Sequence, residues 1–274
     1  MSSGDRIQST FSRLKKEGRA GLVTFITAGD PDPKTSQQLM TQLPDAGSDI
    51  IELGMPFSDP MADGPAIQAA NLRALASGAS LMGTLDMVRR FRENNNTTPV
   101  ILMGYFNPIY QYGPSRFVTD AVAAGVDGLI MVDLPPEEDE ELCDPARTAG
   151  LHWVRLVTPT SNEGRLKQVL QNTSGFIYYV SIAGITGTRS AAASAIGEAL
   201  ATVRKHTQLP IAVGFGINTA EQVRETGEVA DGAVVGSAII REIENNLDAS
   251  GCAKPELLDR VTGLVSDLAG GLRS

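Results

Sequence analysis

Three observations predict an α/β fold built as a single (β/α)8 barrel, the TIM barrel. Short β-branched runs alternate with segments of helical length along the whole chain, no linker or low-complexity segment divides it, and its 274 residues are a normal length for one barrel. We therefore expect one TIM-barrel domain over residues 1–274. An open, doubly wound sheet is the alternative fold.

Eight short runs rich in apolar and β-branched residues predict the strands of this barrel. They cover residues 22–27, 49–53, 100–104, 128–132, 153–157, 176–180, 211–214 and 233–235. Longer segments between them, such as 34–47, 114–125, 163–175 and 191–206, have the apolar spacing of helices that cover a sheet. Residues 1–18 are amphipathic and contain no continuous apolar stretch, so we expect an extra N-terminal helix and no signal peptide.

The composition narrows the class of partner. Apolar residues make up 42% of the chain and charged residues 20%, as in soluble globular proteins, and no apolar run approaches the ~20 residues of a transmembrane helix. A net charge of −9 argues against nucleic acid or an anionic membrane as the partner. We expect a cytoplasmic protein that binds a small metabolite or another protein.

A short pattern recurs before three of the predicted strands. AGSDIIEL, AGVDGLIM and VADGAVVG each place a small residue and an aspartate (Asp49, Asp127 and Asp231) just before an apolar run. Glycine after a helix favours the left-handed conformation that ends the helix. We therefore interpret the pattern as the chemistry of helix-to-strand turns and not as a functional motif.

The segment SDIIELGMPFSDPMADGP, residues 48–65, is the most informative, because the functional residues of a barrel lie at the carboxyl ends of its strands. Glu52 lies among isoleucine and leucine, where burial raises the pKa of a carboxyl group and lets it exchange a proton near neutral pH. A buried ion pair with an arginine is the alternative. Asp63 is either a second functional carboxylate or a turn and helix-cap residue, and turns explain Asp59 and Asp30 most simply.

The residues present exclude several other kinds of catalytic site. His152, at the start of the fifth strand, and His206, before the seventh, cannot build a metal site together, and structural roles explain both. Cys143 and Cys252 are too few for a disulfide framework or a zinc site. The lysines fall on expected helices or the loops leading into them, and no Ser-His-Asp or Cys-His arrangement is present. We expect carboxylate chemistry without a metal.

Glycine-rich segments follow the last three predicted strands. VGFGIN and VVGSAIIREI place glycine at the tips of the seventh and eighth strands, and AGITG follows the sixth. Backbone N–H groups and the positive end of a following helix bind a small anion without lysine or arginine. The last loops of a barrel are its usual phosphate site, so the sequence predicts phosphate binding here, with tight packing as the alternative.

Eight motifs taken together resemble the tryptophan synthase alpha subunit family over nearly the whole chain. They are ITAGDPDP, IELGMPFSDPMADGPAIQ, PVILMGYFNPI, GVDGLIMVDLPPEE, LVTPTS, VSIAGITGTR, PIAVGFGI and GSAII. The resemblance implies a retro-aldol lyase of tryptophan biosynthesis that cleaves indole-3-glycerol phosphate into indole and glyceraldehyde 3-phosphate. It implies no cofactor in this chain, and a pyridoxal-phosphate-dependent beta subunit as partner in an alpha2beta2 tetramer. The alternatives are a free-standing lyase that releases indole and a non-catalytic barrel that binds a phosphate ligand and regulates a partner.

The same resemblance implies roles for individual residues. Glu52 matches the general acid/base, Asp63 the carboxylate that faces the indole nitrogen, and Tyr178 a tyrosine that positions the substrate and the glutamate. The implied indole slot consists of Phe25, Tyr105, Ile130 and Phe215. The implied phosphate site consists of Gly187, Gly216, Gly236 and Ser237. Without the resemblance, Tyr178 and the other aromatic residues would be ordinary strand or core residues.

A lid and a partner surface are implied as well. Residues 182–190 resemble the mobile lid of the family, in which Gly184 permits movement and Thr186 bonds Asp63 on closure. Ile182 stands where some members carry arginine, so we do not expect coupling of the lid to the partner by that route. The loops after the second and third strands are expected to expose apolar residues on which the beta subunit docks. These residues are Pro56, Phe57, Ile109 and Tyr110, with Asp59 at the contact.

Overall fold

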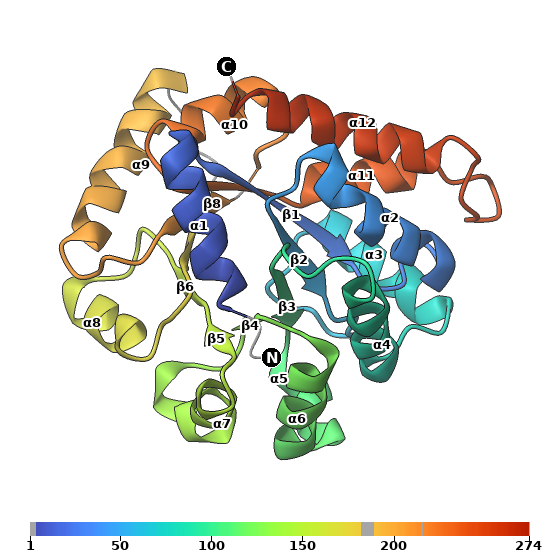
Figure 1. Cartoon of the computed structure of the whole chain (residues 1–274), viewed down its shortest axis with the longest axis horizontal. Coiled ribbons are helices and arrows are strands. Elements are labelled where there is room, and N and C mark those ends of the chain that lie inside the picture. The colour runs from blue at the N-terminus through green and yellow to red at the C-terminus, as the bar shows by residue number, and fades with distance from the viewer. Residues whose placement is uncertain (1–3, 182–188, 215, 274) are drawn as a thin grey trace.

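Parallel strands alternate with helices along the chain and form one barrel, as the sequence predicts (Figure 1). The computed structural model describes residues 4–181, 189–214 and 216–273. The strands are β1 (Gly21–Thr27), β2 (Ile50–Gly54), β3 (Val100–Gly104), β4 (Gly128–Met131), β5 (His152–Trp153), β6 (Arg155–Val157), β7 (Ile177–Val180), β8 (Ile211–Gly214) and β9 (Gly232–Val235). The helices are α1 (Arg6–Glu17), α2 (Pro33–Ala46), α3 (Pro65–Ala76), α4 (Leu81–Arg92), α5 (Phe106–Tyr112), α6 (Pro114–Ala124), η1 (Pro136–Glu141), α7 (Cys143–Thr148), α8 (Glu163–Gln171), α9 (Arg189–Arg204), α10 (Ala220–Gly227), α11 (Ser237–Asn245) and α12 (Leu257–Gly270).

One expected strand, residues 153–157, is divided in two. Only Val154 separates β5 from β6, and the two pieces face different neighbours, since β5 pairs with β4 and β6 pairs with β7. The strand order is β5-β4-β3-β2-β1-β9-β8-β7-β6, so the chain itself closes the barrel at Val154. Barrel strands tilt and shift relative to their neighbours, so a short strand at the closure pairs with each neighbour through different residues.

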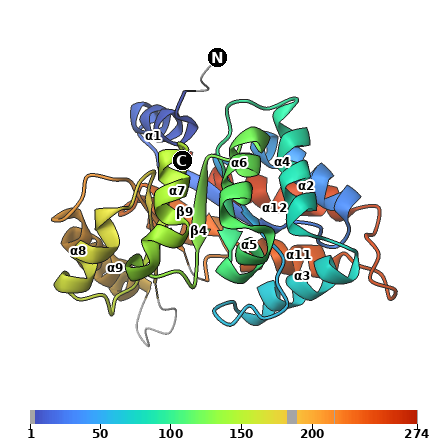
Figure 2. The ribbon, with the colours of Figure 1, turned by 90° about the horizontal axis from the view of Figure 1, so that it is seen from below.

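Side chains that point into the barrel form an inner core. Successive residues of a strand face opposite sides, so every second residue contributes. This core contains Val23, Ile50, Ile101, Ile130, Val154, Phe176, Ala212 and Val234 from the strands and their flanks, and Ile7, Phe11 and Leu14 from α1. The rings of Phe11 and Phe176 pack with their centroids 5.8 Å apart. Figures 1 and 2 show α1 lying across one end of the barrel, which leaves the carboxyl ends of the strands available to a ligand.

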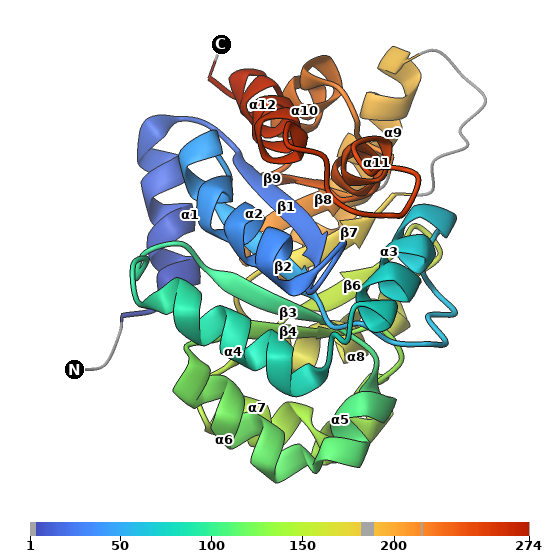
Figure 3. The same ribbon diagram turned by 90° about the vertical axis from the view of Figure 1, so that its right-hand side faces the viewer.

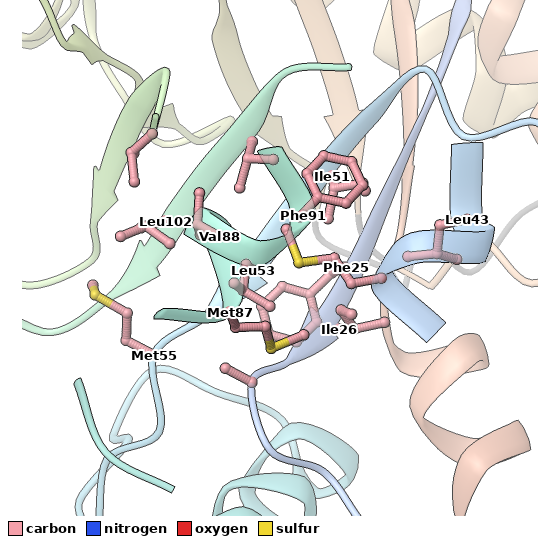
Figure 4. Packing of buried hydrophobic residues seen from close by; sticks show 14 of the residues in the cluster. Phe25, Ile26, Leu43, Ile51, Leu53, Met55, Met87, Val88, Phe91 and Leu102 are labelled. Atoms are coloured by element: carbon pink, nitrogen blue, oxygen red, sulfur yellow. The ribbon is translucent and has the colours of Figure 1, made fainter. Parts of the chain in front are cut away.

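The outer face of the barrel packs against the surrounding helices. Ile26, Leu53 and Leu102 come from three neighbouring strands, and Figure 4 shows them near Met87 and Val88 of α4. Figure 3 shows α10, α11 and α12 gathered on the side of the barrel formed by β8, β9 and β1. Full burial of one such side chain contributes about 2 kcal/mol, so this layer holds the helices on the barrel.

The three aspartates of the recurring pattern hold the start of a neighbouring strand. Each carboxylate accepts a hydrogen bond from a backbone N–H at the start of the strand before its own. The donors to Asp49, Asp127 and Asp231 are Leu22 of β1 at 3.0 Å, Val100 of β3 at 2.8 Å and Ile211 of β8 at 2.8 Å. Each aspartate also forms an ion pair with an arginine near the end of the helix that precedes the bonded strand. Arg92 and Arg204 are the last residues of α4 and α9, and Arg19 lies two residues beyond the end of α1. The pattern is structural, as interpreted, and it stabilises the amino ends of three strands.

Candidate active site

Glu52 lies inside the barrel near the carboxyl end of β2. Ile50 and Glu52 are alternate residues of β2 and face the interior, and Glu52 lies in register with Phe25 of β1 and Ile101 of β3. Glu52 is 0% exposed, and neither carboxylate oxygen has a hydrogen-bond partner among the described residues. This burial raises the pKa of Glu52 from 4.5 to about 8, so the carboxyl group is protonated at neutral pH. An ion pair between Glu52 and an arginine, the alternative weighed above, does not occur within the described part of the chain.

Tyr178 reaches the same interior from β7. Burial, and to a smaller extent the charge of Glu52, raise the pKa of the Tyr178 phenol well above its ordinary value, so the hydroxyl stays neutral. The ring tip lies against Gly214 at the end of β8, where a Cβ atom would lie 2.8 Å from Cζ of Tyr178. The absence of a side chain at Gly214 therefore lets Tyr178 lie near Glu52.

Asp63 lies in the segment between β2 and α3 and lines a small crevice at the carboxyl ends of the first strands. Burial raises the pKa of Asp63 from 3.8 to about 6, while the Tyr105 hydroxyl and the Asn71 amide favour the ionised form and limit this rise. Asp63 is not a helix cap, because Gly64 is the N-cap of α3 and no described side chain caps that helix. At pH 7 Asp63 is ionised while Glu52 is neutral, and two such carboxyl groups can take different roles in one reaction.

Phe25 connects two sides of this crevice. A Cβ atom at Gly54 would lie 2.6 Å from the ring of Phe25, and a Cβ atom at Gly236 would lie 3.2 Å from the Cβ of Phe25. The ends of β2 and β9 therefore meet against one aromatic residue. Tyr105 also lines the crevice, whereas Ile130 is buried in the inner core and is not among the lining residues. Phe215, the fourth residue of the expected indole slot, lies outside the described residues.

The expected phosphate end is at the junction of β9 and α11. Gly236 precedes the first turn of α11, none of the described side chains caps this helix, and Gly236 and Ser237 are partly exposed. The first N–H groups of a helix have no partner within it and are available to an anion. Gly216, after β8, is exposed and has a φ of 75°, a backbone conformation that favours glycine. The phosphate residue Gly187 and the lid residues Ile182, Gly184 and Thr186 lie outside the described residues.

Several residues of the crevice were not expected from the sequence. They are Met55, Ile67, Asn71, Met103 and Val132. The sequence contained a sign of Asn71, because it is a polar residue at a helical position between the apolar residues Ala70 and Leu72. The sequence analysis also did not foresee that Gly54, Gly104 and Gly214 leave space for neighbouring side chains, although each of these glycines ends an apolar strand run. Their missing side chains leave room for Phe25, Met55 and Tyr178.

The expected partner surface is only partly exposed. Tyr110 is 59% exposed, and Phe57 is partly exposed. The expected exposure of Ile109 and Pro56 is wrong, because Ile109 is 0% exposed and Pro56 is buried. Ile109 lies on the side of α5 that faces the protein interior, and it packs into the apolar layer between the barrel and its helices.

The chain after β2 stays close to the barrel before it turns outward. Met55 donates its backbone N–H to the carbonyl of Met103 at 2.8 Å, which extends the pairing of β2 and β3 and accounts for the burial of the next residue, Pro56. Met61, in the same loop, is 84% exposed. Asp59 is exposed in the same loop and bonds the hydroxyl of Ser58.

Other titratable groups lie away from this site. His152 bonds Asp5 at 2.9 Å, at the end of the barrel that α1 covers. Asp30 is 1% exposed and forms two hydrogen bonds with Arg73, so it fixes its loop as expected. Within residues 4–181, 189–214 and 216–273, no three His, Cys, Asp or Glu side chains are grouped as a metal site would require. No helix in that part of the chain is long and apolar enough to cross a bilayer.

Comparison with known proteins identifies the family. The family described as Tryptophan synthase alpha chain matches residues 11–264. Tryptophan synthase subunit alpha from Legionella pneumophila str. Paris is 41% identical, with 97% of this chain and 98% of that chain covered and a TM-score of 0.89. The open form of tryptophan synthase from M. tuberculosis is 31% identical, with 98% of this chain and 99% of that chain covered and a TM-score of 0.86. The chain therefore belongs to the tryptophan synthase alpha chain family and acts in tryptophan biosynthesis as a carbon–carbon lyase.

Proposed function

We propose that Glu52 is the proton carrier with which this chain cleaves indole-3-glycerol phosphate into indole and glyceraldehyde 3-phosphate. The observation that supports this best is the state of Glu52, which is buried with no hydrogen-bond partner among the described residues, protonated at neutral pH and close to Tyr178. General acid–base chemistry by such a group needs neither a metal nor a cofactor. We accordingly propose that the chain itself uses no cofactor.

The reaction requires two proton transfers. The neutral carboxyl group of Glu52 donates its proton to carbon 3 of the indole, which leaves positive charge on the ring nitrogen. The Glu52 carboxylate then accepts the proton of the hydroxyl on the adjacent glycerol carbon. The bond between the two carbons breaks, its electrons restore the indole ring, and the hydroxyl oxygen becomes the aldehyde oxygen. Glu52 ends protonated, so each cycle regenerates it.

Asp63 and Tyr178 assist this cycle. Asp63 is ionised above about pH 6 and therefore carries negative charge when the ring nitrogen becomes positive. Tyr178 is neutral and half-buried near Glu52, so it restricts the orientation of the carboxyl group and of the substrate. The two carboxyl groups thus divide the work, since one transfers protons and the other stays charged.

The substrate spans the carboxyl ends of the strands. Its indole ring would lie against Phe25 and Tyr105, and its phosphate would bind the N–H groups at the start of α11, beside Gly236 and Ser237. Phe25 lies next to both regions, because its Cβ atom faces Gly236 and its ring faces Gly54. An anion bound by backbone N–H groups is also compatible with a net charge of −9.

Replacing Gly214 with alanine is expected to lower kcat by about 10- to 100-fold, because the new methyl group displaces Tyr178 and with it the geometry around Glu52. Steady-state indole release measures the effect. Gly263→Ala is the matched control, since a Cβ atom at Gly263 on α12 meets nothing within 4 Å. An unchanged kcat for Gly214→Ala would show that the position of Tyr178 does not matter.

The direct test of the function is indole release from indole-3-glycerol phosphate by the purified chain, alone and with a beta subunit. Release in either condition supports the proposed reaction, and no release in both contradicts it. High turnover by the chain alone would favour the free-standing lyase, whereas a large increase on adding the beta subunit is expected for a partner-dependent subunit. Binding of the substrate without turnover would favour the regulatory barrel.

We further propose that the chain is cytoplasmic and assembles with a pyridoxal-phosphate-dependent beta subunit as an alpha2beta2 tetramer. Phe57, Met61 and Tyr110 supply exposed or partly exposed apolar groups in the segments after β2 and β3, with Asp59 among them. Pyridoxal phosphate would be held by the beta subunit alone. Gel filtration of an equimolar mixture is expected to show one complex, and separate elution of the two chains would contradict the assembly.

A further inference from the structure

Asn71 is a buried amide on α3, next to the site. It is 4% exposed and shares the inner face of the helix with Ala70 and Ala74, which are 0% exposed. A buried amide is costly unless its polar atoms are hydrogen-bonded. The partners of Asn71 therefore indicate why an amide stands among alanines.

Two hydrogen bonds fix the orientation of this amide. Oδ1 of Asn71 accepts from the backbone N–H of Phe57 at 3.2 Å, and Nδ2 donates to the carbonyl of Ile67 at 3.0 Å. If the amide were flipped, its NH2 group would face the N–H of Phe57 and its oxygen would face the carbonyl of Ile67, and both hydrogen bonds would be lost. Nδ2 carries two hydrogens, so a second donor remains after the bond to Ile67.

The Asn71 side chain lies beside Asp63. Asn71 and Asp63 line the same crevice, and Tyr105 lines it with them. The Tyr105 hydroxyl accepts a hydrogen bond from the backbone N–H of Ala62, the residue before Asp63, at 2.9 Å. The rings of Phe57 and Tyr105 also pack with their centroids 5.5 Å apart. The chain around Asp63 is therefore held at two backbone positions, Phe57 by Asn71 and Ala62 by Tyr105.

We propose that Asn71 is a positioning residue that holds the Asp63 carboxylate and keeps it ionised for the substrate. This inference rests on the role proposed above for Asp63. Asn71 does not touch the reacting atoms, and it acts through Asp63. The Phe57 backbone fixes the amide, and the amide in turn presents a donor to the carboxylate.

The titration of Asp63 agrees with this arrangement. Burial raises the pKa of Asp63, and the Asn71 amide and the Tyr105 hydroxyl both favour the ionised form. Tyr105 is itself neutral, with its pKa raised to about 12 by burial and by the charges of Asp63 and Asp133. Among the described residues, Tyr105 is thus the only other side chain that stabilises the Asp63 carboxylate.

The test measures the pKa of Asp63 directly. Aspartate labelled with 13C at the side-chain carboxyl is titrated by NMR, and the Asp63 resonance is assigned by its absence in Asp63→Asn. Asn71→Ala removes the donor, so the Asp63 pKa is expected to rise by about one unit. Asn71→Asp keeps the acceptor for Phe57 but adds a second carboxylate, so a larger rise is expected. The acidic side of the pH profile of kcat/KM for indole release should move to higher pH as the Asp63 pKa rises.

Asn246→Ala is the matched control. Asn246 is 8% exposed, and its Nδ2 donates to the carbonyl of Glu242, four residues earlier, at 2.8 Å, as Asn71 does to Ile67. This control is expected to leave the Asp63 titration unchanged. An unchanged Asp63 pKa in both Asn71 variants overturns the inference. A rise in Asn71→Asp alone also overturns it, because the added charge explains that rise.

The NMR result does not depend on turnover, so a wild-type chain that releases no indole contradicts the proposed function and not this inference.

Discussion

Replacing Glu52 with glutamine is expected to lower kcat for indole release by about a thousandfold or more, because general acid–base catalysis contributes about 10²- to 10⁴-fold. Glutamine has nearly the same shape as a protonated glutamate, but it has no transferable proton. Substrate binding should change little, since Glu52 makes no hydrogen bond among the described residues. Steady-state kinetics with and without a beta subunit measure the loss.

The same variant is expected to be more stable than the wild type at alkaline pH. Glu52 has a pKa of about 8 in the folded protein and 4.5 when unperturbed, so the folded state binds this proton more tightly. The stabilising contribution of protonated Glu52 is complete below pH 4.5 and is lost as the pH rises through 8. The loss has an upper limit on the order of 5 kcal/mol.

Glutamine does not ionise, so Glu52→Gln escapes this loss. Urea denaturation of both proteins at mildly acidic and at alkaline pH should show a difference in the free energy of unfolding that grows with pH. A difference that is independent of pH would contradict the raised pKa. Wild-type activity in Glu52→Gln would contradict the role of Glu52 as proton carrier.

Replacing Asp127 with alanine is expected to reduce the free energy of unfolding by about 3 to 5 kcal/mol, as is typical when one partner of a buried ion pair is removed. The Asp127 carboxylate lies 2.9 Å from Arg6 and 2.6 Å from Arg92, whose side chains are 11% and 8% exposed. It also accepts the backbone N–H of Val100 at 2.8 Å. Burial already lowers the pKa of Arg92 to about 10, and Asp127 is the group that opposes this.

Asp231→Ala is the matched comparison for this loss. Asp231 occupies the same place in the recurring pattern and accepts the backbone N–H of Ile211, but its ion pair with Arg204 is more exposed, at 38% and 43%. We expect it to cost only about 1 to 2 kcal/mol, because exposed ion pairs contribute little. Urea denaturation measures both losses. Equal losses in the two variants would show that burial of the arginines does not determine the effect.

The sequence predicted the parts of the fold that depend on local patterns. Strand runs and amphipathic segments placed the barrel and the N-terminal helix, and Glu52 was recognisable as a charged residue inside an apolar run. The orientation of Glu52 followed from the alternation of side chains along a strand, because Glu52 and Ile50 point to the same side, into the barrel. Tyr178 had no such signal, because an aromatic residue on a strand is ordinary, and only the family resemblance indicated it.

Features that depend on long-range packing were not predictable in this way. The break at Val154 arises because the barrel closes there, which no local pattern encodes. Ile109 was expected on the surface but lies on the inner side of a short helix, where the facing residues decide burial. The aspartates of the recurring pattern were recognised as turn residues, but the strand N–H groups that they bind come from residues about 20 to 30 positions away.

The pKa of Glu52 itself tests the central claim most directly. Glutamate labelled with 13C at the side-chain carboxyl can be titrated by NMR, with the Glu52 resonance identified by its absence in Glu52→Gln. A carboxyl group that is buried with no hydrogen-bond partner in the described part of the chain and that carries protons at neutral pH should titrate with a midpoint near 8. A midpoint near the ordinary value of 4.5 would show that Glu52 is ionised in the resting protein and would contradict its role as the proton donor.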